Sequence, residues 1–189
     1  MRRFLLFLVL VFLLLKAPAL AFEIRNLGVG TEKGYLVCYW EVADLPYEDL
    51  EEALKHGIPL EIKFEIVLLQ LRSFRRDKEI LRYETSREIY FDPVKKLYFV
   101  NFIGLPRLPQ QTSSLEEAFE IAGNVKALPL IPINLLQPKS TYRLKVQGIL
   151  IQKVQPGLPS RLLRFIFQSG KIKSKWASIR FKLPPREKP

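Results

Sequence analysis

The chain has 189 residues, of which 30 are Lys or Arg and 19 are Asp or Glu, so its formal net charge at neutral pH is +11. With one cysteine and one histidine, it can form no internal disulfide and has too few soft ligands for a zinc site. This length and composition predict a single basic domain whose core is held by packing alone.

The N-terminus has the pattern of a secretory signal peptide over residues 1–21. Two arginines precede an apolar run at residues 4–15, and Ala19 and Ala21 form an Ala-x-Ala site. The run is shorter than the ~20 apolar residues of a membrane-spanning helix. We therefore expect cleavage after Ala21 and export to the periplasm or cell envelope. The alternative is an uncleaved anchor that holds the chain on the membrane through residues 4–15.

From Phe22 onward, apolar and polar residues alternate as they do in β-strands with one buried face. In the first half of the domain the alternation predicts strands at residues 34–43, 60–71, 79–91 and 97–102. The last two flank a turn at residues 92–96 and form a predicted hairpin. Residues 67–71 are apolar on both faces, which indicates a bulge or burial on both faces.

A short helix is predicted between the first two of these strands. Pro46 suits the first helical turn, and Gly57 suits the end of the helix. The predicted buried stripe consists of Leu50, Ala53 and Leu54. His56 stands just before Gly57, where a cation is favourable at the negative end of a helix, so a capping role is expected.

The second half of the domain mixes strands with proline-bearing connectors. Residues 105–109 and 128–132 are predicted to be loops or edge segments, because proline cannot donate to a central ladder. A capping box at residues 113–116 predicts a helix that ends at Gly123. Further strands are predicted at residues 141–151 and 177–183, residues 158–168 fit either a helix or a strand, and the tail at 184–189 is expected to be disordered.

These elements predict a mainly β fold. Strands predominate, and they do not alternate regularly with helices, which argues against a parallel α/β sheet. The expected architecture is an immunoglobulin-like β-sandwich of about seven strands with two or three short helices. It occupies residues 22–183 as one domain.

Residues able to carry chemistry are scarce. Cys38 lies in an apolar strand and is expected to be buried, and a lone histidine cannot complete a nucleophile-base arrangement. The acidic residues of the first helix suit its positive end rather than a paired-carboxylate site. Gly28 and Gly30 lack the third glycine of a dinucleotide loop and indicate a turn or bulge. We therefore expect no enzymatic activity, no cofactor and no metal.

Two basic groups are candidates for a binding surface. Arg72, Arg75 and Arg76 surround Phe74, and a second group at strand spacing stands beside Trp176 and consists of Lys171, Lys173 and Lys175. Cationic and aromatic residues together suit an anionic surface or an acidic partner segment. The alternative for the lysines is a solvated edge that resists unwanted strand pairing.

Several segments occur in an order that resembles one bacterial family, domain of unknown function 4390. They are residues 52–60, Arg72, Leu81-Arg82-Tyr83 with Arg87 and Tyr90, residues 115–118, 142–144 and 158–159, and 174–176. The chain departs from the family pattern where tryptophans are expected near Phe74 and Ile172. The resemblance implies a signal-bearing envelope protein without established activity, often encoded near a membrane sensor kinase, and it implies no catalytic residues.

The densest motif of this resemblance comprises Tyr83, Arg87 and Tyr90. Alternation along a strand places Tyr83 and Arg87 on one face and Tyr90 on the other. An arginine among inward aromatic residues is expected to be a buried hydrogen-bonding hub, with a ligand contact as the alternative.

The leading hypothesis is an exported, non-enzymatic module that binds another envelope protein through an exposed edge or its basic face. A role as a signalling accessory follows only from the resemblance. The alternative is a protein that binds anionic lipid or glycolipid, either on the basic face or in an inter-sheet cavity lined by residues 67–71 and 149–151. Export argues against a nucleic-acid partner.

Overall fold

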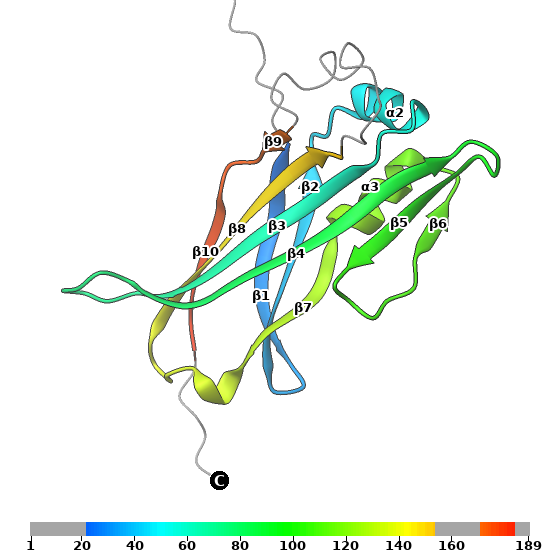
Figure 1. Ribbon diagram of the computed structural model, residues 1–189. Coiled ribbons are helices and arrows are strands. Elements are labelled where there is room, and N and C mark those ends of the chain that lie inside the picture. The colour runs from blue at the N-terminus through cyan, green and yellow to red at the C-terminus, as the bar shows by residue number, and fades with distance from the viewer. Residues whose placement is uncertain (1–21, 154–170, 184–189) are drawn as a thin grey trace, which may run out of the picture.

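The computed structural model describes residues 22–153 and 171–183. In these residues two β-sheets face each other, with one α-helix at an end of the pair and another at its side (Figure 1). The predicted mainly β, sandwich-like architecture is thus confirmed. The predicted leader, the ambiguous segment at 158–168 and the predicted tail lie outside the described residues.

The smaller sheet is antiparallel and has the order β1-β2-β7. Its strands are β1 (Glu23–Glu32), β2 (Tyr35–Ala43) and β7 (Val125–Pro132). Lys33 and Gly34 join β1 to β2 with φ of 49° and 79°, and positive φ at both central residues is what a tight two-residue hairpin requires. Of the two proline-bearing connectors predicted as loops or edge segments, the one at residues 128–132 lies in β7, which is an edge strand. The predicted bulge near Gly28 is present as a register shift between Arg25 and Gly28.

The larger sheet has the order β10-β8-β3-β4-β5-β6, with β9 pairing with β8 beside β10. Its strands are β3 (Leu60–Gln70), β4 (Lys78–Asp92), β5 (Leu97–Ile103), β6 (Gln110–Thr112), β8 (Thr141–Gln152), β9 (Lys171–Lys173) and β10 (Ala177–Lys182). A 3-10 turn, η1 (Ile133–Leu135), precedes β8. The described chain thus has ten strands where about seven were predicted. Strands β6 and β9 are too short to show a period, β7 contains prolines, and β1 was not identified as a strand from the sequence.

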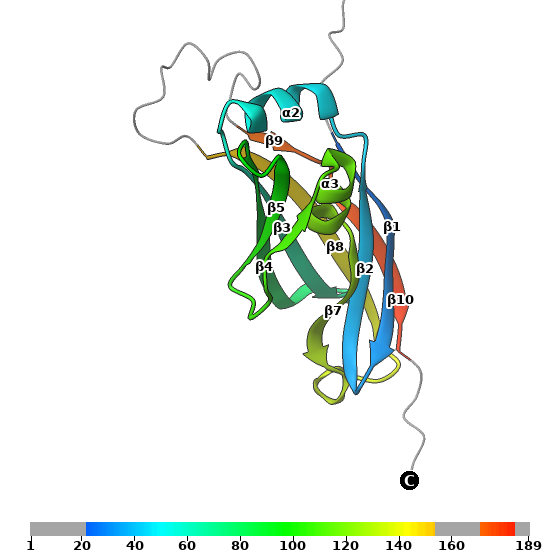
Figure 2. The ribbon, with the colours of Figure 1, turned by 90° about the vertical axis from the view of Figure 1, so that its right-hand side faces the viewer.

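The two helices cover one end and one side of the sandwich. Helix α2 (Tyr47–Lys55) caps the end with the predicted stripe of Leu50, Ala53 and Leu54, which is fully buried. Helix α3 (Leu115–Gly123) stands at the side where the sheets diverge, between β5 and β2 (Figure 2). Its N-cap is Ser114, which accepts from the backbone N–H of Glu117. The cap is therefore one residue later than the predicted box. The Glu117 side chain accepts a hydrogen bond from the Thr112 hydroxyl.

The core lies between the inner faces of β3 and β2. Ile62, Phe64 and Ile66 of β3 have no exposed surface, and the ring of Phe64 packs at 5.0 Å from that of Trp40 on β2. Burial of each such side chain contributes about 1.5–3 kcal/mol. Farther along β3, Val67 and Leu68 are both buried and the register with β4 then shifts. Of the two predicted alternatives for this segment, burial on both faces is the one observed, whereas the extra residue at the register shift is Ile80 of β4.

The smaller sheet packs against the larger one through a close contact at Gly148. The ring of Phe22, which precedes β1 and is 1 % exposed, lies where a side chain at residue 148 would be, because an added Cβ would stand 2.5 Å from the ring. Ile24 approaches the same point. The absence of a side chain at Gly148 thus lets the start of β1 pack directly on β8.

A Gly148→Ala variant tests this contact. We expect the free energy of unfolding to fall by about 1–3 kcal/mol, because the added methyl group overpacks the Phe22 ring. Urea denaturation measures the change. Gly30→Ala on β1 is the matched control, since its Cβ would meet Val37 at an ordinary 3.5 Å. Equal effects in the two variants would contradict the close-packing explanation.

Candidate functional site

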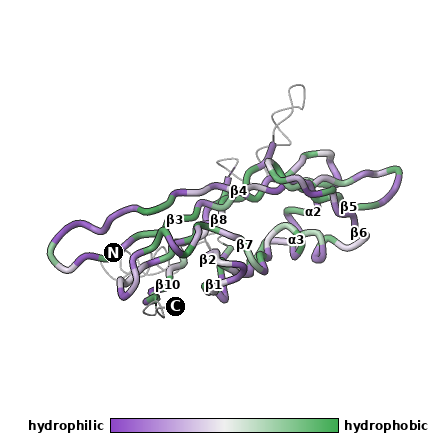
Figure 3. The backbone as a smooth tube through the Cα atoms, turned by 90° about the horizontal axis from the view of Figure 1, so that it is seen from below, coloured by the Kyte–Doolittle hydropathy of each residue, from purple (hydrophilic) through white to green (hydrophobic). Residues whose placement is uncertain are grey.

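The arginine group lies at the tip of a long hairpin. Strands β3 and β4 pair as far as Gln70 and Lys78, and the loop between them holds Arg72, Arg75 and Arg76, all exposed. Phe74 in the same loop is 98 % exposed. Figure 3 shows the hairpin extending past the rest of the described chain, with hydrophilic stretches on both sides of its end. The ring of Phe74 is thus exposed to solvent among cationic side chains.

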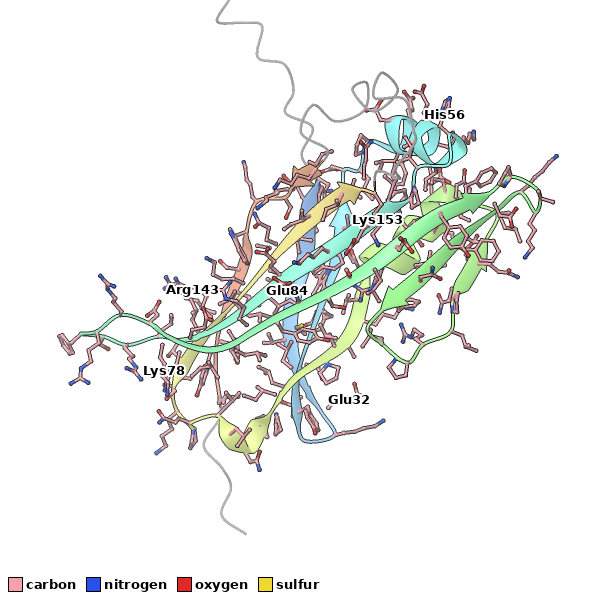
Figure 4. All side chains as sticks on the ribbon, viewed as in Figure 1. Glu32, His56, Lys78, Glu84, Arg143 and Lys153 are labelled. Atoms are coloured by element: carbon pink, nitrogen blue, oxygen red, sulfur yellow. The ribbon has the colours of Figure 1, made fainter. Side chains whose placement is uncertain are left out.

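Contacts of Asp77 hold the base of this hairpin in place, and the base is also cationic. Asp77 accepts from the backbone N–H of Arg72 at 3.4 Å and lies 4.0 Å from Arg143 of β8. Figure 4 shows Arg143 and Lys78 near this end of the molecule. Such half-exposed pairs contribute little to stability. Asp77 therefore orders the loop without neutralising it.

The lysine group lies elsewhere, along the outer edge of β8. Lys171 and Lys173 of β9 and Lys175 after it are exposed, while the intervening Ile172 is buried. Strand β9 pairs with residues 149–151 of β8, whereas the arginine hairpin adjoins its other end near Tyr142. The two basic groups therefore do not form one surface.

The described sheet edges are poorly suited to pairing with an added strand. Strand β6 has three residues, and β7 carries Pro129 and Pro132. Strand β1, the other edge of the smaller sheet, has ten residues, but the register shift between Arg25 and Gly28 interrupts its regular pairing pattern. The edge formed by β9 and β10 is interrupted at Ser174, whose hydroxyl accepts from the backbone N–H of Gly148 at 2.9 Å. Short, kinked or proline-bearing edges with lysines oppose strand addition.

The motif residues of β4 point to two different faces, as alternation predicts. Tyr83 and Arg87 lie on the face that looks between the sheets, where both line a cleft. Tyr90 lies on the opposite face and stacks on Phe99 of β5, with ring centroids 5.1 Å apart. Tyr90 thus supports strand pairing, and the other two residues belong to the interior.

Arg87 is a buried cation, and no counter-charge among the described residues contacts it. The residue is 4 % exposed, and its Cζ lies 5.3 Å from the Phe64 ring and 5.8 Å from the Phe102 ring. Its Nε and Nη1 have no hydrogen-bond partner in the described ranges. The aromatic neighbours of Arg87 are thus as expected, whereas its role as a hydrogen-bonding hub is not visible in the described part of the chain.

The electrostatic surroundings of Arg87 do not compensate for the burial of its charge. Burial first, and then the nearby charge of Arg107, lower the pKa of Arg87 to about 10, against an opposing effect of Tyr83. A group with this pKa is still protonated at neutral pH. The side chain therefore keeps its positive charge inside the protein.

The cleft that Arg87 lines has a volume of about 750 Å³. The cleft lies beside α3. Its walls come from β4, β5, the loop after β5, α3 and β7. Its lining includes Phe102, Leu105, Arg107, Ile121, Lys126 and Leu128. Helix α3 and β7 were not recognised as parts of a site in the sequence, because their contact with β4 is set by tertiary packing and leaves no local pattern.

The predicted inter-sheet cavity is distinct from this cleft. Neither residues 67–71 nor residues 149–151 line the cleft around Arg87. Val67 and Ile149, on the outer face of the larger sheet, are each only 5 % exposed.

The two residues with catalytic potential lie apart from this cleft. His56 follows α2, and its Nδ1 lies 2.7 Å from the carbonyl oxygen of Glu52, a contact at the end of the helix. Figure 4 shows it at the opposite end of the molecule from Lys78. Cys38 is fully buried in β2. Within the described ranges, no three residues of the types His, Cys, Asp and Glu gather as a metal site would need.

Cys38 is expected to be chemically inert in the folded protein. Burial raises the pKa of its thiol to about 12, so the reactive thiolate is almost absent at neutral pH. We expect Ellman's reagent at pH 8 to modify it at least a hundredfold more slowly than in urea-unfolded protein. Equal rates in the two states would contradict the burial of this residue.

The described residues place this protein in the class of two-sheet β-sandwiches, with a cleft beside α3. The chain belongs to the family described as Domain of unknown function (DUF4390), whose model matches residues 19–180. This confirms the resemblance seen in the order of the sequence segments. A search of curated proteins gives no significant match. None of the described helices is long and apolar enough to cross a membrane.

Proposed function

We propose that this protein is an exported, non-enzymatic module of the cell envelope that binds another envelope protein through the tip of the β3–β4 hairpin. The observation that carries the proposal is the exposure of Phe74, 98 %, among three arginines on a projecting loop. Aromatic residues and arginine are the types enriched at the centres of protein interfaces. Export is supported by the leader pattern at residues 1–21.

The partner surface is expected to be acidic, with an apolar recess for the ring of Phe74. Arg72, Arg75 and Arg76 attract negative charge at a distance and speed the encounter. Burial of the aromatic ring then supplies the contact energy. The hairpin is favoured over strand addition because the described sheet edges are short, kinked or interrupted by proline.

Site-specific photocrosslinking in intact cells tests this proposal. A photoreactive phenylalanine analogue at position 74 should capture an envelope protein, because the ring becomes buried on binding. The same analogue at position 94 is the matched control. Val94 is 89 % exposed in the turn at the other end of β4, and it should give little or no product.

The same cells report on export. N-terminal sequencing of the purified protein should begin at Phe22 if the leader is removed after Ala21. Equal crosslinking from positions 74 and 94 would contradict the hairpin as the docking element. Products that contain only cytoplasmic proteins would contradict the envelope location.

A further inference from the structure

The cleft beside α3 carries an inference that is independent of the hairpin. Its distinguishing feature is the side chain of Arg87, which is 4 % exposed and whose Nε and Nη1 have no hydrogen-bond partner among the described residues. An uncompensated charge in a protein interior costs several kcal/mol. A fold does not need an arginine at this place, because alternation would accept an apolar residue on the inner face of β4.

The aromatic contacts of Arg87 do not offset this cost. A cation–π contact contributes about 0.5–2 kcal/mol, which is less than the cost of the buried charge. The guanidinium also carries N–H donors in its plane, and its Nε and Nη1 have no hydrogen-bond partner among the described residues. Phe64 and Phe102 therefore contact the guanidinium without satisfying these donors.

The rest of the cleft indicates what the ligand is like. Its walls are largely apolar, with Phe102, Leu105, Ile121 and Leu128 among them, and a second arginine, Arg107, stands at the exposed rim with its Cζ 4.8 Å from the ring of Phe102. Phe102 is thus flanked by two cations. Ligand sites commonly combine such apolar walls with a few polar groups that fix orientation.

Charge limits the head group of the ligand. One buried guanidinium is neutralised by one negative charge, and its planar donors match the two oxygens of a carboxylate. The cleft is also lined by Arg107 and Lys126 and by two carboxylates, Glu117 and Glu120. Three cations and two carboxylates leave a net charge of +1, which favours a head group with one negative charge. The volume of about 750 Å³ lies in the range of small-molecule sites.

We propose that the cleft between β4, β5, α3 and β7 binds a single-chain fatty acid, with its carboxylate on Arg87 and its hydrocarbon chain along the apolar walls. Arg107 at the rim attracts the head group on entry. This site differs from the predicted lipid cavity in its position and in having a specific anchor. It does not depend on the partner proposed for the hairpin.

Isothermal titration calorimetry tests the proposal on protein purified from cells that express the full-length chain, after delipidation. The probes are dodecanoate, dodecanol and dodecyl phosphate, used below their aggregation concentrations. Dodecanoate should bind with a Kd below about 1 mM and more tightly than either of the others. Absence of dodecanoate binding, or tighter binding of dodecanol or dodecyl phosphate, would overturn the proposal.

Three variants test whether Arg87 binds the carboxylate of the fatty acid. Arg87→Met should weaken dodecanoate binding at least about thirtyfold, because a buried charged hydrogen bond is lost. Arg107→Met should weaken it less. Arg82→Met is the matched control on the same strand, because Arg82 is exposed on the opposite face in an ion pair with Glu79, and it should bind as the wild type does.

A second readout separates binding from folding. Without ligand, Arg87→Met should unfold at a temperature equal to or above that of the wild type, since a buried charge without a partner is removed. Dodecanoate should raise the melting temperature of the wild type and not that of Arg87→Met. A less stable Arg87→Met variant, or one that dodecanoate stabilises equally, would show that Arg87 is structural and would refute the proposed anchor.

Discussion

The packing of β2 against β3 is the constraint on which the rest of the structure depends. The chain has one cysteine, so no internal disulfide can join the sheets, and the sheets are held where the Trp40 ring meets the Phe64 ring. The remaining inward positions of β3 are fully buried around this contact. Because the Phe64 ring also lies 5.3 Å from Cζ of Arg87, the centre of the core adjoins a residue that lines the cleft.

Much of the fold could be predicted from local pattern because its strands are amphipathic. The hairpin of β4 and β5 and the strands β2, β3, β8 and β10 follow directly from alternation, and the helix stripe of Leu50, Ala53 and Leu54 follows from spacing. Strand β7 was recognised only as a loop or edge segment, because its prolines weaken the strand signal. The N-cap of α3 was placed one residue early because Ser113 and Ser114 are both able to cap.

The candidate sites were predicted less completely, for a physical reason. Alternation correctly places Tyr83 and Arg87 on one face of β4 and Tyr90 on the other. It does not reveal that Nε and Nη1 of Arg87 have no hydrogen-bond partner among the described residues, since that depends on strands paired across the sheet. The two basic groups resemble each other in sequence, yet β8 keeps them at its opposite ends. Only the pairing register distinguishes them.

The central position of β3 also governs how the protein can fold. Strand β3 pairs on one side with β4, its neighbour in sequence, and on the other with β8, from which it is separated by nearly the whole middle of the chain. Contacts between remote segments form slowly because a long loop must first be closed. Until β8 arrives, one flank of β3 stays open. The larger sheet is therefore completed late, and its first hairpin must persist without aggregating in the interval.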